Sequence, residues 1–246
     1  MGYRLKIKNK IQAPIANSLL PMARFLPFAY CLIFIVSLSF ADAQKGDEAL
    51  SKLLDGNRRF ISGNLATKDN GDARSKALSK AQHPSAIVVT CSDSQAAPEI
   101  IFDQGLGDIF VVRSAGNVLD PISVGSIEYA AEHLHAPLLI LLGHDKCDVV
   151  SAAVEAKEKT EDNIWTILRK ILPAVKKATA MGGTKEDILN NAIRENVLLQ
   201  QKYLLRKSPV VKKLIASGDL KVVTGIYHLE SGVIELFSAL SKQQTQ

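Results

Sequence analysis

Four short, mainly apolar runs constrain the fold of this chain more than any other feature. They cover residues 86–90, 108–113, 138–142 and 221–226. Runs of five or six such residues are typical of strands that are buried on both faces, as in a parallel sheet. Helical periodicity is found between or beside them, at residues 46–63, 122–135, 148–159, 162–180 and 185–207. This alternation predicts a single α/β domain, with a mainly parallel central sheet flanked by helices.

The first 43 residues have the composition of a secretory signal. Basic side chains between Arg4 and Arg24 precede an apolar segment at residues 25–40, and Ala41-Asp42-Ala43 offers small residues for cleavage. A retained membrane anchor is the alternative, but a span needs about 20 apolar residues and this segment is shorter. We therefore expect a signal peptide over residues 1–43 and a mature domain over residues 44–246. The domain would be exported, to the periplasm, without stable membrane insertion.

The charge balance changes once the signal segment is set aside. The whole chain has a formal net charge of +5, but the segment holds five of the 30 Lys and Arg and one of the 25 Asp and Glu. The mature chain therefore carries 25 basic and 24 acidic side chains. Because no basic patch is left over, we expect no nucleic acid among the partners.

Two cysteines remain in the mature chain, Cys91 and Cys147. A disulfide between them is one interpretation for an exported protein. However, Cys91 directly follows the first predicted strand, and His144 and Cys147 directly follow the third. The carboxyl ends of neighbouring parallel strands are where ligand sites form. A disulfide would also leave His144 and the nearby Asp93 unexplained, so the pattern favours a shared metal ion.

The donor set itself indicates the kind of metal site. Two thiolates and one imidazole give zinc three protein ligands and an open fourth position, the pattern of catalytic rather than structural zinc. Such an ion lowers the pKa of a bound water toward 7, which supplies hydroxide for attack on a small electrophilic carbon. The spacing of the residues indicates this reaction class and no more.

The sequence resembles the beta-class carbonic anhydrases. The family pattern Cys-x-Asp-Ser-Arg, followed by His-x-x-Cys, is matched at Cys91, Asp93, Ser94, His144 and Cys147. Further segments that are similar to the family lie at residues 98–108, 112–117 and 125–130. The resemblance extends from about Gly46 to Leu236.

This resemblance implies the reversible hydration of CO₂ to bicarbonate and a proton, with Zn²⁺ held by Cys91, His144 and Cys147. It implies that Asp93 is the carboxylate beside the open position, which accepts a hydrogen bond from zinc-bound water or becomes a fourth ligand. It also implies a homodimer or higher homo-oligomer in which the helix over residues 46–63 packs on the partner.

Two positions depart from the family pattern at the reaction centre. Gln95 stands where the family has an arginine that pairs with the aspartate and holds it off the metal. A glutamine side chain has no charge and cannot make the bidentate hydrogen bonds of a guanidinium group. Asp148 stands where the family usually has glycine, and adds negative charge. Two alternatives to a fully active carbonic anhydrase therefore stay open. One is a zinc hydrolase of a related small molecule, such as carbonyl sulfide or carbon disulfide, and the other is a catalytically weakened zinc-binding homologue.

Overall fold

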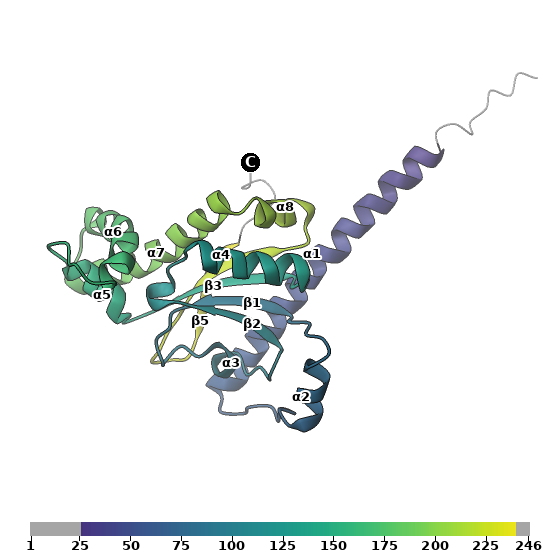
Figure 1. The fold of residues 1–246 in the computed structure, drawn as a ribbon, viewed down its shortest axis with the longest axis horizontal. Helices are drawn as coiled ribbons and strands as arrows, with labels where there is room; N and C mark the ends of the chain where they lie inside the picture. Colours follow the sequence, from purple (N-terminus) through teal and green to yellow (C-terminus); the bar gives the residue numbers. More distant parts are fainter. Residues whose placement is uncertain (1–25, 240–246) are drawn as a thin grey trace, which may run out of the picture. The chain divides into compact units, whose positions relative to one another are not determined.

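The computed structural model describes the backbone of residues 26–239 and the side chains of residues 44–237. The predicted signal segment, residues 1–43, lies outside the described side chains, and its cleavage stays a prediction. The chain divides into two compact units, Met1–Ser37 and Leu38–Gln246, and the second is an α/β domain (Figure 1). Within the part of the chain that the structure describes, no helix has both the length and the apolar character needed to span a membrane.

The domain is built on a five-stranded sheet with the strand order β2-β1-β3-β4-β5. Its strands are β1 (Ala86–Thr90), β2 (Ile109–Arg113), β3 (Leu138–His144), β4 (Lys221–Tyr227) and β5 (Ile234–Ala239). The first four are parallel, which confirms the mainly parallel sheet, and β5 is antiparallel to β4. Strand β3 runs beyond the predicted apolar run, so that His144 is its last residue rather than the first residue of a loop.

The helices over residues 164–181 and 185–207 follow the predicted ranges, the first helix begins before the predicted residues 46–63, and the helices over residues 72–78, 98–101 and 209–217 were not predicted. The helices are α1 (Leu26–Ile61), α2 (Asp72–Leu78), α3 (Pro98–Ile101), α4 (Pro121–Glu128), α5 (Asp148–Glu155), α6 (Ile164–Met181), α7 (Lys185–Lys207) and α8 (Pro209–Ser217), with a 3-10 turn η2 (Ala115–Asn117) and a π-turn η3 (Tyr129–His133).

Two helix predictions need correction. The pattern over residues 122–135 forms α4 and then the π-turn η3 rather than one α-helix. The helix predicted over residues 148–159 ends at Glu155. Residues 157–160 are exposed, so they have no buried apolar face to hold a further helical turn, and helices in proteins depend on such packing.

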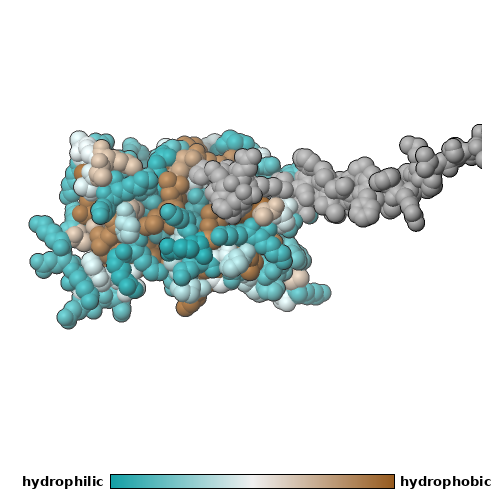
Figure 2. Space-filling view, turned by 90° about the horizontal axis from the view of Figure 1, so that it is seen from above, coloured by the Kyte–Doolittle hydropathy of each residue, from teal (hydrophilic) through white to brown (hydrophobic). Residues whose placement is uncertain are grey.

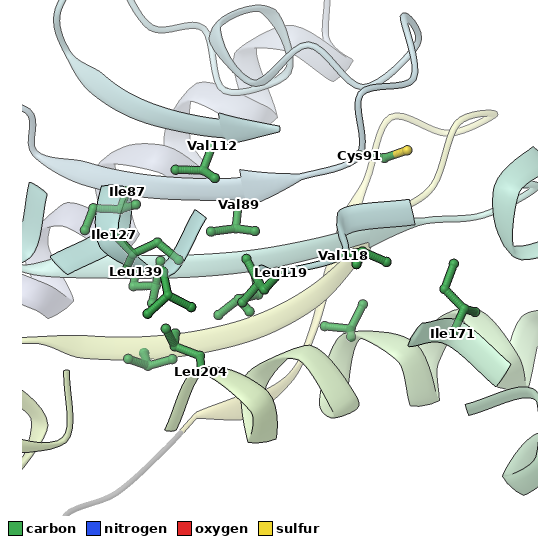
Figure 3. Close-up of a cluster of buried hydrophobic side chains, with 14 of the residues drawn as sticks. Ile87, Val89, Cys91, Val112, Val118, Leu119, Ile127, Leu139, Ile171 and Leu204 are labelled. Carbon is green, nitrogen blue, oxygen red and sulfur yellow. The ribbon is translucent and has the colours of Figure 1, made fainter. Parts of the chain in front are cut away.

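The sheet has a hydrophobic core on each face, because successive strand residues point to opposite sides. Ile87 and Val89 belong to the core that α4 to α8 cover, part of which is drawn in Figure 3. Val88 belongs to the other core, which α1 and α3 cover. Ala49 and Leu53 of α1 are buried there. The helix predicted to pack on a partner subunit therefore packs on its own sheet, and a partner contact stays a prediction.

Gly143 brings α7 close to the end of β3. A Cβ atom at this position would lie 2.8 Å from Cγ2 of Val197 and 3.0 Å from Cδ1 of Ile226. Both distances are shorter than ordinary van der Waals contact, so a larger residue would push the helix and the strand apart. The glycine just before His144 thus fixes the packing that positions this strand end.

Candidate metal centre

The three predicted metal ligands come together at the carboxyl end of the sheet. Cys91 follows β1, His144 ends β3, and Cys147 caps the amino end of α5. Their ligand atoms all lie within 4.8 Å of one another, and all three residues are buried. Lys146, between His144 and Cys147, has a positive φ of 52°. This conformation is unusual for a residue other than glycine, and turns the chain so that both ligands face one point.

His144 has the hydrogen bonding of a metal ligand. Its Nδ1 lies 2.9 Å from the backbone carbonyl oxygen of Asp145. Because a carbonyl only accepts, Nδ1 carries the proton and Nε2 is left with a free lone pair. This Nε2 is buried and has no hydrogen-bond partner. A buried polar atom without a partner is costly, and a metal ion at this point would remove the cost.

The two sulfur atoms suit a cation as a third partner. Cys91 and Cys147 are both free, so the disulfide alternative is not formed. A hydrogen bond from the Cys147 thiol lowers the pKa of Cys91 to about 4, against the effect of burial and with help from His144. The same hydrogen bond, together with burial, raises the pKa of Cys147. One thiolate is therefore already stabilised, and a divalent cation would take the place of the proton on the other.

Asp93 lies beside this cluster and points toward it. Its Oδ2 is 3.9 Å from Nε2 of His144, and its backbone N–H donates to Sγ of Cys91 at 3.4 Å. The carboxylate is held by the backbone N–H of Gln95, which donates to Oδ1 at 3.0 Å. Asp93 is therefore within reach of the position where a fourth metal ligand would sit.

The two departures from the family pattern have different surroundings. The side chain of Gln95 is exposed and makes no hydrogen bond to another described residue; only its backbone contacts Asp93. Asp148 is exposed in the first turn of α5. A carboxylate is favourable there, because the amino end of a helix carries partial positive charge.

Sequence reasoning did not identify Arg113 as a site residue. Its guanidinium donates from Nε to the backbone oxygen of Cys91 at 3.0 Å and from Nη2 to that of Asp93 at 2.5 Å. The strand register pairs Arg113 with Thr90, directly before Cys91. An arginine at the end of a predicted strand next to a ligand-bearing strand could have indicated this contact.

Comparison with known proteins gives a consistent family assignment. A family model described as carbonic anhydrase matches residues 86–234. The carbonic anhydrase of Mycolicibacterium smegmatis is 38% identical over 195 residues, which cover 78% of this chain and 93% of that protein. Carbonic anhydrase 2 of Mycobacterium tuberculosis is 36% identical over 188 residues, covering 75% of this chain and 89% of its own length.

Solved structures agree with these sequence matches. The beta-carbonic anhydrase CafA of Aspergillus fumigatus has a TM-score of 0.63 and 26% identity, over 69% of this chain and 83% of that one. One of two tetrameric beta-carbonic anhydrases of Sordaria macrospora has a TM-score of 0.60 and 25% identity, over 68% and 87%. With the matched sequence, the shared fold and the Cys-His-Cys cluster taken together, this chain belongs to the beta-class carbonic anhydrase family.

Proposed function

We propose that this protein is a zinc-dependent carbonic anhydrase that catalyses the reversible hydration of CO₂ to bicarbonate and a proton. The observation that carries the proposal is the buried cluster of Cys91, His144 and Cys147, in which Nε2 of His144 has no protein partner. We infer the reaction of this cluster from the family, because the matched relatives are carbonic anhydrases.

The residues around the site have separate tasks in this proposal. Zinc held by three protein ligands supplies Lewis acidity at an open position, which makes water a nucleophile near neutral pH. Cys91, His144 and Cys147 would hold the ion, and the carbonyl of Asp145 keeps His144 in the tautomer that offers Nε2. Asp93 would accept a hydrogen bond from water beside the ligands, because its carboxylate faces them.

Gln95 is proposed to leave the enzyme slow at neutral pH. The backbone N–H of Gln95 donates to the Asp93 carboxylate, and no Lys or Arg among the described residues forms an ion pair with it. The carboxylate is then free to occupy the fourth ligand position, where it would exclude the reacting water. Hydrogen bonds to charged groups contribute about 1.5–3 kcal/mol, so a missing guanidinium is enough to shift this balance tenfold or more.

A homodimer or higher homo-oligomer is proposed from the surface of the described part. Strand β2 lies at one edge of the sheet, and an exposed edge is a natural site for pairing. Beside it, the ring of Tyr129 is 6.4 Å from that of Phe110 in β2, and Tyr129 is 47% exposed; Ile122 at the start of α4 is 80% exposed. Figure 2 shows apolar areas among the hydrophilic ones on one face of the molecule. Sedimentation velocity of the protein and of Ile122→Glu tests this: a smaller species for the variant supports an interface here, and an unchanged species contradicts it.

Export with removal of residues 1–43 is proposed on the composition of that segment alone. Intact-mass analysis of the protein recovered from outside the cytoplasm should give a chain that begins at or near Gln44. A full-length mass in the membrane fraction would instead support an anchor.

Stopped-flow CO₂ hydration tests the proposed activity. The zinc-loaded protein should catalyse hydration above the buffer rate, lose this catalysis when a chelator removes the metal, and regain it when zinc is added back. A protein with one zinc per chain and no catalysis at any pH between 7 and 9 would contradict the proposal.

A further inference from the structure

The segment after β2 supplies a hydrogen bond to a metal ligand from an unusual backbone conformation. The backbone N–H of Gly116 donates to Sγ of Cys91 at 3.2 Å. Gly116 and Asn117 have positive φ values of 65° and 47° in succession. Glycine and asparagine are the residues that adopt this conformation most readily, and contacts with other elements hold the segment in place.

Two buried amides of α7 hold this segment. Asn196 donates from Nδ2 to the backbone oxygen of Gly116 at 2.8 Å. Gln200 accepts on Oε1 from the backbone N–H of Leu119 at 3.0 Å. The two amides are also joined to each other, since Nε2 of Gln200 donates to Oδ1 of Asn196 at 3.0 Å. Figure 3 shows Leu119 lying between the strands and the helices, with Cys91 at the end of β1.

The two amides are almost completely buried, so their hydrogen bonds matter for stability. Asn196 is 0% exposed and Gln200 is 2% exposed. An amide that is buried away from water is costly unless its groups are paired, and these two are paired with the 116–119 segment and with each other. Residues 196 and 200 are four apart in a helix and therefore lie on one face of it. The face of α7 that contacts residues 116–119 thus carries the connected amides of Asn196 and Gln200.

We propose that Asn196, oriented by Gln200, is a positioning residue for the metal ligand Cys91. Asn196 fixes the carbonyl of Gly116, and this keeps the N–H of the same residue directed at the Cys91 sulfur. Hydrogen bonds of this kind tune how strongly a ligand holds its metal, and their removal typically weakens metal affinity or activity 10- to 100-fold. The inference rests on the proposed function in that Cys91 binds zinc.

The test compares two substitutions on the same helix. Asn196→Leu keeps the approximate volume and removes both hydrogen-bonding groups. Gln201→Leu is the matched control, because Gln201 is also buried, and its Nε2 has no partner in the described structure. Zinc affinity is measured on the full chain by competition with a chromophoric chelator. We expect Asn196→Leu to bind zinc about 10- to 100-fold more weakly, and Gln201→Leu to stay within about twofold of the original protein.

A spectroscopic readout separates positioning from a general loss of stability. In the cobalt-substituted protein, the sulfur-to-cobalt charge-transfer band should shift or weaken in Asn196→Leu and stay unchanged in Gln201→Leu. Asn196→Leu with unchanged zinc affinity and an unchanged cobalt band would overturn the inference, even if the variant melts at a lower temperature.

If circular dichroism shows that Asn196→Leu does not fold, Gln200→Met decides the question. This variant leaves Asn196 in place but removes the amide that orients it, so zinc binding should weaken in the same direction with a shifted cobalt band. Unchanged values would overturn the inference. Absence of zinc binding in the unsubstituted protein would instead contradict the proposed function, so the two failures are distinguishable.

Discussion

The two segments that carry the metal ligands are held in different ways. In the segment after β3, the ligand residues themselves are held locally: His144 bonds the carbonyl of Asp145, Lys146 makes the turn, and Cys147 is the N-cap residue of α5. The distant contacts of this segment go to Asp145, which is bonded by Tyr227, His228 and Leu229, and not to a ligand. The segment after β1 is held from a distance, by Arg113 of β2 and by Gly116 beyond it. The comparison teaches that ligand identity is a local property of the sequence, whereas the geometry of a ligand can depend on residues far along the chain.

The largest effect should come from removing a ligand from the locally held segment. Cys147→Ser should lose most of its zinc and with it CO₂ hydration, because a neutral hydroxyl is a far poorer ligand than a thiolate. Zinc content per chain is the measurement. The original protein is the reference and should hold about one zinc per chain. Equal zinc in the variant and the original protein would show that the cluster is not the metal site.

The distantly held segment should be sensitive to Arg113. Arg113→Lys keeps the charge but loses the fork that binds the carbonyl oxygens of Cys91 and Asp93, so zinc affinity should fall on the order of 10- to 100-fold. Arg74→Lys is the matched control, since Arg74 binds the carbonyl of Leu106 and the carboxylate of Asp108 in a similar way. If both variants bind zinc equally well, the comparison between the two segments fails.

The rate of CO₂ hydration should change when position 95 gains a positive charge, but not when the amide of Gln95 is removed. Gln95→Arg would offer Asp93 a charge-assisted pair that draws the carboxylate away from the ligands. A gain of about 1.4 kcal/mol would raise CO₂ hydration at pH 7 about tenfold. Gln95→Ala should stay within about twofold, because the backbone and not the side chain contacts Asp93. Equal stopped-flow rates for the original protein and Gln95→Arg would contradict this account of the carboxylate.

The smallest effect is expected at Lys146. Its left-handed conformation costs a residue with a Cβ about 1–2 kcal/mol, which glycine would avoid. Glycine loses more conformational entropy on folding, and this reduces the gain in stability. Lys146→Gly should therefore raise the free energy of unfolding by about 0.5 kcal/mol in a urea titration, with zinc affinity unchanged. A loss of zinc affinity would mean that the side chain itself, and not the turn, supports the ligands.

The contrast between local sequence features and contacts from distant residues also explains how much could be predicted from the sequence. Strands β1, β3 and β4 are almost wholly buried and leave apolar runs, so they and the three metal ligands at the strand ends were predicted. The edge strand β2 was predicted as well, because Ile109 to Val112 are apolar even though it is partly exposed. Strand β5 was missed because Glu235 and Ser238 interrupt its apolar residues, so that it has no such run.

The supporting residues of the site were harder to predict for a physical reason. Asn196 and Gln200 look like ordinary polar positions of a helix, and only the fold shows that they are buried against the 116–119 segment. Likewise, the contact of Gln95 with Asp93 goes through its backbone, which the residue type does not reveal.

X-ray absorption at the zinc edge tests the central claim most directly, namely that Cys91, His144 and Cys147 hold a catalytic zinc ion. The account predicts two sulfur ligands at about 2.3 Å, with one imidazole nitrogen and one further nitrogen or oxygen at about 2.0–2.2 Å. A zinc ion with no sulfur ligands, or with four, would contradict it.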